Sequence, residues 1–128
     1  MENKLDLEID NREKAIQFLS ELTTKLLQYQ GSDIIIAAGS PPALKINQSV
    51  HQVGNQRLTP QQTSSLVRAV MSDRHLQQFE QHHEASFSLN FPDFARFRVT
   101  AFTQRGSAGM VLRLLHHTVP TLDGLNLP

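Results

Sequence analysis

The sequence has no cysteine and no tryptophan, and only one of its 128 residues is tyrosine. The lack of cysteine excludes disulfides, thiolate metal ligands and cysteine nucleophiles, and it suits the cytosol. The 12 basic and 12 acidic side chains give a formal net charge of zero, so no overall field favours nucleic acid or an anionic membrane. No apolar run approaches the roughly 20 residues of a membrane span, and the N-terminus lacks the basic-then-apolar order of a signal peptide.

A phosphate-binding loop is also missing. Such a loop needs a Gly-rich turn followed by Lys and Ser or Thr, so that backbone N–H groups and the ammonium can hold phosphates. None of the six glycines is followed by lysine. The length suits one domain with a core of its own, and these residues alone are not expected to form a catalytic site.

The first third of the sequence predicts a helix. Residues 1–9 are polar, and Asp10 or Asn11 can cap a helix that runs to about Gln30. Apolar residues recur along this segment at helical spacing and give it one buried stripe. Gly31 is expected to end the helix in the left-handed conformation.

Short strands are expected to follow. The run of β-branched residues over 33–38 has no polar face, which is typical of a buried strand. Two prolines then force a turn, because each removes a donor and fixes φ. Residues 43–47 and 50–53 predict a short hairpin around Gln48-Ser49.

The middle of the chain predicts two more helices. Thr59, Pro60 and Gln62 form the clearest helix start in the sequence: a cap, a proline at the first helical position and a side chain that can reach back to the cap. A second helix is expected over 72–82, where Ser or Asp can cap it.

The last third changes to a period of two. Residues 85–91 and 95–101 alternate apolar with polar, so each strand buries one face. Pro92-Asp93 separates the two strands, and Gly106-Ser107 predicts a hairpin into a return strand over 109–115. The order of helix, strands, two helices and antiparallel strands predicts an α+β sandwich, with helices packed on a mainly antiparallel sheet.

Several candidates for chemistry are weak. His82-His83 and His116-His117 are adjacent pairs whose rings point apart, so neither pair chelates a metal easily, and we expect no metal site. Glu80 and Glu84 suit a solvated helix face better than acid/base work. Ser40 has neither the flanking glycine pattern nor the exposure of a nucleophile. No catalytic residue is expected within this chain.

The arginines of the final hairpin are better candidates. Arg96, Arg98, Arg105 and Arg113 crowd it, and a guanidinium offers five donors in a planar fork that suits phosphate or carboxylate. Cross-strand ion pairs are the simpler alternative. Between Phe87 and Leu122 the only acid is Asp93. This shortage of local partners favours the interpretation that some of the arginines face a partner outside the domain.

Two stretches of the sequence resemble a known family. The N-terminal signature of the type IV pilus retraction ATPases, the PilT/PilU family, is similar to residues 31–47, Gly-Ser-Asp-Ile-Ile-Ile-Ala-Ala-Gly-Ser-Pro-Pro-Ala-Leu-Lys-Ile-Asn. The arginine-rich hairpin of that family resembles residues 95–113, and the linker to its ATPase core resembles residues 119–128. The match covers about residues 14–128, and its hairpin is closer to the accessory PilU type than to PilT. A His and an Asp/Asn-Gly turn that are common in the first motif are absent here.

The resemblance implies a domain organisation. Residues 1–9 would be a flexible N-terminus and residues 10–117 a PAS-like N-terminal domain. Residues 118–128 would be a linker that leads to a RecA-like core with the Walker motifs. In such hexamers the N-terminal domain packs on a neighbouring subunit's core, with ATP between domains.

The resemblance also implies site residues and partners. Arg98, Arg105 and Arg113 are the candidates for contacts to the nucleotide phosphates. ATP and Mg²⁺ would be cofactors of the whole protein, an ATP hydrolase, and not of this domain by itself. Its partners would be the ATPase cores of its own homo-hexamer, a partner retraction ATPase and the inner-membrane platform protein of the pilus. Its location would be the cytoplasmic base of that machine.

A second interpretation stays open. A PAS-like sandwich of this size could be a stand-alone module that binds a small ligand or a partner peptide, with the arginines forming salt bridges only. Nucleic-acid binding is the weakest alternative, because neutral charge and scarce aromatics give neither a phosphate footprint nor a stacking platform.

Overall fold

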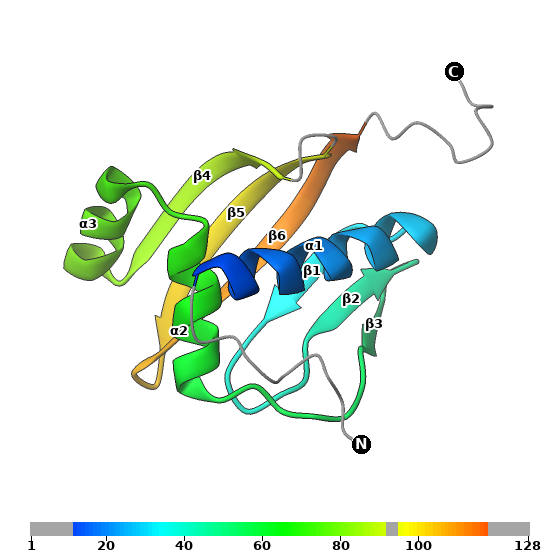
Figure 1. The fold of residues 1–128 in the computed structure, drawn as a ribbon, viewed down its shortest axis with the longest axis horizontal. Coiled ribbons are helices and arrows are strands. Elements are labelled where there is room, and N and C mark those ends of the chain that lie inside the picture. The colour runs from blue at the N-terminus through cyan, green and yellow to red at the C-terminus, as the bar shows by residue number, and fades with distance from the viewer. Residues whose placement is uncertain (1–11, 92–94, 118–128) are drawn as a thin grey trace.

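The computed structural model describes residues 12–91 and 95–117, which form one six-stranded antiparallel sheet with three helices (Figure 1). The strands follow the order β3-β2-β1-β6-β5-β4 across the sheet. The elements are α1 (Arg12–Gln28), β1 (Asp33–Ile36), β2 (Ala43–Ile46), β3 (Ser49–Gln52), α2 (Pro60–Ala69), α3 (Asp73–His82), β4 (Glu84–Asn90), β5 (Ala95–Gln104) and β6 (Ser107–His117).

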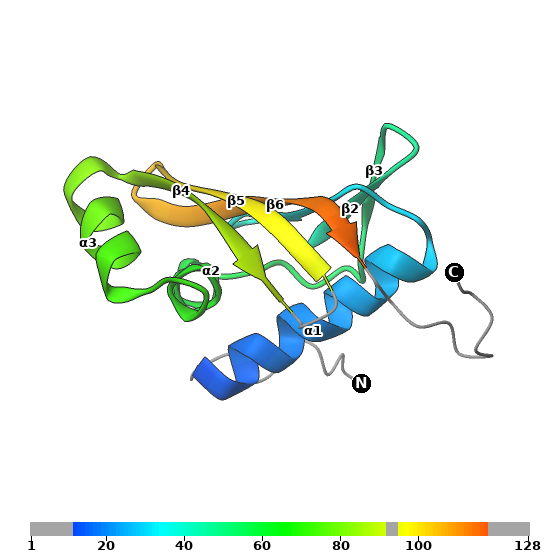
Figure 2. The same cartoon turned by 90° about the horizontal axis from the view of Figure 1, so that it is seen from above.

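All three helices lie on one side of the sheet, and in the part of the chain that the structure describes no helix covers the other side (Figure 2). On the covered side α1 contacts α2 and β1, α2 contacts β6, and α3 contacts β4. The predicted α+β class with a mainly antiparallel sheet is therefore confirmed. We call the side without helices the open face.

The strand alternation places the core where the sequence predicts it. Phe97, Val99, Met110 and Leu112 are completely buried on β5 and β6, while the residues between them on β5 are exposed. Burying one such side chain contributes roughly 1.5–3 kcal/mol, so a strand that slipped by one residue would forfeit most of the core. The core therefore fixes which side chains reach the open face.

The two predicted helix starts are also confirmed. Thr59 and Gln62 form a complete capping box: the Gln62 N–H donates to Thr59 Oγ1 at 3.1 Å, and the Thr59 N–H donates to Gln62 Oε1 at 2.8 Å. Ser72 caps α3 through the N–H of His75. The proposed caps at positions 10 and 11, the turn at 92–93, and the segments 1–9 and 118–128 lie outside the described residues.

The prediction for Gly31 is wrong in its reason. Gln30 takes the left-handed conformation, with φ of 59°, whereas Gly31 does not have a positive φ. Gly31 lies where the helix end meets β2: a Cβ atom there would stand 2.6 Å from Leu26 Cδ1 and 2.9 Å from the Lys45 carbonyl oxygen. Glycine is required at this position by close approach and not by backbone conformation.

Two predicted turns shift by one residue. The β2–β3 turn is made by Asn47 and Gln48, with φ of 51° and 72°. The β5–β6 turn is made by Arg105 and Gly106, with φ of 54° and 80°. Both pairs have positive φ, as two-residue hairpins prefer, because that twist matches the twist of the strands. Because the β5–β6 turn begins at Arg105, this residue is not part of β5, which ends at Gln104.

We expect Gly31→Ala to lower the free energy of unfolding by about 1–3 kcal/mol, because the new methyl group meets a backbone oxygen that cannot rotate away. Gln30→Gly is the matched control and should stay within about 1 kcal/mol of the unchanged chain, since glycine relieves the left-handed strain but loosens the unfolded state. Urea denaturation of the three proteins measures both. Equal losses would contradict the assignment of the two roles.

Candidate functional site

A row of charged residues crosses the open face through four neighbouring strands. Lys45 on β2 stands opposite Asp33 on β1, Asp33 stands opposite Arg113 on β6, and Arg113 stands opposite Arg98 on β5. Neighbouring strands are about 4.8 Å apart, so the four side chains emerge side by side. We call these four residues the central row.

The burial of their sequence neighbours shows why this row faces outward. Ile34, Leu112 and Phe97 are 0% exposed and belong to the core, which lies on the helix side. Successive side chains of a strand point to opposite faces, so the residues next to them point away from the helices. The core therefore aims the central row at the open face.

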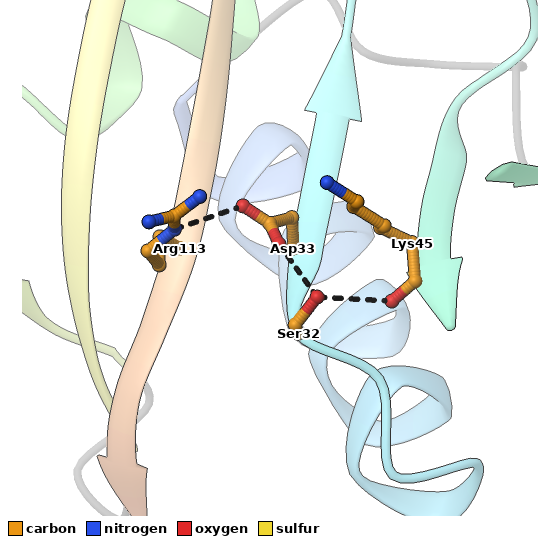
Figure 3. Close-up of polar contacts among 4 residues, drawn as sticks. All are labelled: Ser32, Asp33, Lys45 and Arg113. Carbon is orange, nitrogen blue, oxygen red and sulfur yellow. Dashed lines mark hydrogen bonds and ion pairs between the residues drawn. The ribbon is translucent and has the colours of Figure 1, made fainter. Parts of the chain in front are cut away.

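Asp33 is the anion at the centre of this arrangement. Its side chain is only 6% exposed, and Arg113 Nε donates to its Oδ2 at 3.4 Å. The Ser32 hydroxyl donates to its Oδ1 at 2.6 Å, and that hydroxyl also lies 3.4 Å from the Lys45 carbonyl oxygen. Figure 3 shows Lys45 and Arg113 on either side of Asp33. A buried carboxylate needs such partners, because burying an unpaired charge is costly.

Arg113 keeps most of its hydrogen-bonding capacity. Its side chain is 66% exposed, and Nε is its only atom that bonds to another described residue. The terminal Nη1 and Nη2 groups carry four of the five guanidinium donors. Arg98 is exposed, and its side chain makes no hydrogen bond or ion pair with any described residue. The two side chains can therefore present donors to an anion in bidentate geometry.

Arg98 and Arg113 are directly opposed across the strands. Like charges in this position repel and weaken a sheet. A register shift between Arg96 and Phe97 leaves Leu115 of β6 without a partner, so that His116 stands opposite Arg96 beside the pair. Asp33 is the one acidic residue of the central row, whose other three residues are basic. An anion is the natural complement of this part of the open face.

The structure does not bring Arg105 to the other two candidates. Arg105 lies in the β5–β6 turn, at the far end of the strand from Arg98, roughly 20 Å away at the usual rise per residue. There it lines a separate hollow of about 240 Å³, together with Gln104, Ser107 and Phe102. Arg98 and Arg113 thus form one group, and Arg105 stands apart.

The sequence reasoning missed the acid that matters most among the described residues. It looked for partners of the arginines near them in sequence, yet Asp33 and Arg113 are 80 residues apart. The missed signal was the Ser-Asp pair at the head of a buried strand, where a polar side chain must find a partner. Lys45 was missed for the same reason, since only the register brings β2, β1 and β6 into one row.

The other candidates have ordinary roles. Glu80 forms an exposed ion pair with Arg68 at 2.9 Å, as expected for a solvated helix face. His83 is the left-handed cap of α3. Within residues 12–91 and 95–117, no three His, Asp or Glu side chains are arranged to hold a metal ion. No helix of this described part is long and apolar enough to cross a membrane.

Comparison with curated proteins links the chain to pilus motors. It is 40% identical over 108 residues to the type IV pilus ATPase PilU of Pseudomonas aeruginosa, which covers 84% of this chain and 28% of that protein. It is 32% identical over 109 residues to PilT, a type IV pilus retraction ATPase of the same organism, which covers 85% of this chain and 32% of PilT. The chain thus spans about a third of the length of these relatives. No family model matches it.

Solved structures agree with the sequence matches. The crystal structure of the pilus retraction motor PilT with bound ADP superposes with a TM-score of 0.72 at 30% identity, over 86% of this chain and 32% of PilT. The ATPase DotB of Legionella pneumophila has a TM-score of 0.68 at 23% identity, which shows a shared fold. By fold and by sequence, the chain belongs to the PilT/PilU family of type IV pilus ATPases and corresponds to a part of its members.

Proposed function

We propose that this chain serves as the N-terminal domain of a hexameric type IV pilus retraction motor, where it mediates subunit packing and supplies arginines to the ATP phosphates. The observation that carries the proposal is the pair Arg98 and Arg113, opposed on the open face with donors that no described residue uses. The names of the relatives, a retraction ATPase and a motor with bound ADP, support a nucleotide as the anion.

The chemistry of phosphoryl transfer suits this pair. Charge on the transferring γ-phosphoryl group needs cationic donors that are already in place. Two arginines whose backbones are fixed on adjacent strands of one sheet can direct both guanidiniums at the same group. When bound, Mg²⁺ would neutralise phosphate charge, but it prefers oxygen ligands, and Asp33 is already engaged by Arg113 and Ser32. We therefore assign Mg²⁺ binding and hydrolysis to the RecA-like core of the whole protein.

The arginines would divide the work. Arg98 and Arg113 act together on one phosphate group, because their strands are adjacent. Arg105, from the turn at the far end of β5, would reach a different phosphate or a different subunit. The sequence named all three as candidates for contacts to the nucleotide phosphates, and this proposal assigns them to two separate places.

The open face would be the surface that meets the neighbouring ATPase core. Next to the central row this face also carries Val50 of β3, which stands opposite Lys45 and is 59% exposed. A sheet face with apolar and cationic residues and no helical cover is suited to bury against a partner. The further partners in this proposal are a partner retraction ATPase and the pilus platform protein, at the cytoplasmic base of the machine.

In the full-length ATPase, Arg113→Ala or Arg98→Ala should lower kcat for ATP by about 10²-fold, the usual effect of removing one donor to transition-state charge. Arg68→Ala is the matched control, because Arg68 pairs with Glu80 on the helix side of the sheet, and its turnover should not change. Steady-state ATP hydrolysis, with circular dichroism to confirm folding, measures all three. Normal turnover in both hairpin variants would refute the phosphate role.

The two arginines should differ in stability. Arg113→Ala leaves the buried Asp33 carboxylate without its cation and should cost about 1–2 kcal/mol, a value limited by the exposure of Arg113. Arg98→Ala removes a cross-strand repulsion, so its free energy of unfolding should stay equal or rise by up to about 0.5 kcal/mol. Urea denaturation at low and high salt measures both. A larger loss for Arg98→Ala would mean that Arg98 has a structural partner.

One observation favours the alternative of a stand-alone ligand-binding module. A hollow of about 730 Å³ lies between α1 and the β2–β3 hairpin, lined by Lys25, Tyr29, Ile46, His51 and Val53 among others. This volume is in the range of small-molecule sites. It offers both apolar walls and polar groups.

Thermal denaturation of this chain with ATP, ADP and a set of small organic acids separates the two functions. A ligand present at a hundred times its Kd should raise Tm by roughly 10 °C. We expect less than about 2 °C with any of them, because most of the nucleotide site would lie on the core. A large shift with a small acid and none with nucleotide would favour the stand-alone module.

A further inference from the structure

We infer that Asp33 is a positioning residue, which holds Arg113 with its terminal nitrogens available for phosphate before the nucleotide arrives. The inference rests on the proposed function of Arg113. Asp33 itself faces the arginine and not the phosphate, so it would act only through Arg113.

The contact uses Nε and leaves both terminal nitrogens of the guanidinium for another partner. Asp33 Oδ2 accepts from Nε of Arg113, and Nη1 and Nη2 bond to no described residue. Arg68 differs, because its Nε donates to Ser64 and its Nη1 donates to Glu80. Arg68 is thus committed to its neighbours, whereas Arg113 is anchored and still has its fork of donors.

Asp33 is well placed to act as a fixed anchor. Its backbone pairs with β2 on one side and β6 on the other, and its side chain is 6% exposed. Ser32 donates to Oδ1, so that oxygen is occupied and Oδ2 is left for Arg113 (Figure 3). A carboxylate held in this way has little freedom to follow a moving arginine. The arginine, with its long and exposed chain, is therefore oriented by the aspartate.

Orientation matters because a free arginine side chain must lose much of its rotational freedom to bind one phosphate. Anchoring Nε removes part of that loss in advance, which is the usual benefit of preorganisation. Arg98 stands directly opposite and would push an unanchored Arg113 away. The attraction of Asp33 for Arg113 opposes this repulsion, so that both arginines could bind the same phosphate.

The Nε–Oδ2 distance of 3.4 Å indicates a weak hydrogen bond between opposite charges, which biases the direction of Arg113 and leaves its other donors available. It is longer than the 2.9 Å of the Arg68–Glu80 pair, and longer than the usual range for a strong hydrogen bond. Arg113 is therefore held in direction while remaining largely exposed to an incoming anion. The Lys45 side chain, on the other side of Asp33, bonds to no described residue and leaves Oδ2 to Arg113.

A double-mutant cycle in the full-length ATPase tests the inference. The variants are Asp33→Ala, Arg113→Ala and the double variant, with kcat and KM for ATP measured for each. We expect Asp33→Ala to lower kcat/KM by about 10- to 100-fold, as misplacement of a catalytic group does. The double variant should equal Arg113→Ala within about twofold, because Asp33 has no target once Arg113 is absent. Glu80→Ala is the matched control for loss of an acid paired with arginine and should leave both constants unchanged.

The outcomes separate this inference from the proposed function. If Arg113→Ala hydrolyses ATP normally, the phosphate role of Arg113 and the role of Asp33 both fail. If Arg113→Ala is impaired, but Asp33→Ala is normal or lowers kcat/KM by the same factor with and without Arg113, only the role of Asp33 fails. Circular dichroism checks folding, and Asp33→Thr, with a β-branched side chain suited to a strand, replaces Asp33→Ala in the same cycle if the alanine variant does not fold.

Discussion

The pairing of β1 with β6 is the constraint on which the rest of the structure depends. The strands β1, β2 and β3 form one antiparallel unit, and β4, β5 and β6 form another. The two units join in one sheet only where β1 meets β6. That single ladder lets α1 and α2 cover a continuous core, and it carries Asp33 to Arg113 across 80 residues of sequence. A slip of one residue would turn Ile34 outward and Asp33 inward, so the core and the charged row are fixed by one register.

The one-sided cover of the sheet explains how a neutral chain presents a cationic surface. Net charge says nothing of where charges lie, and here the strand alternation sorts them. Apolar residues of β5 and β6 meet the helices, so their polar neighbours gather on the open face. The result is local: Arg96, Arg98 and Arg113 lie near one another, with Asp33 as the anion in their row. Such a surface would recognise an anion by the position of its charges and not by a long-range field.

Local chemistry was predictable from the sequence, and distant pairing was not. The capping box at Thr59, the alternation of β5 and the order of elements follow from interactions within a few residues, and the structure confirms them. The two hairpin turns were each predicted one residue too late, and Gly31 was assigned a backbone role that it does not have. Both features depend on how a neighbouring strand approaches. The pairing of Asp33 with Arg113 could not be predicted, since no local sequence pattern gives the register between strands that lie so far apart in the chain. Arg98 and Arg113 could be named as candidates from the sequence, because their residue type and crowding mark them without any knowledge of the fold.

The strongest sign of function is an arrangement that does not help the fold. Arg68 shows what an arginine used for structure looks like in this protein: two nitrogens bonded, on a helix, opposite an acid. Arg98 faces another arginine instead, and cross-strand repulsion of this kind weakens a sheet. The described part of the chain offers the pair one carboxylate, and that carboxylate takes a single Nε–H bond from Arg113. Within the described residues these donors are unused and lie on a sheet face that no helix covers, where an oxyanion would convert the repulsion into binding. Under the proposed function, the cost to the sheet would be the condition for recognising a phosphate.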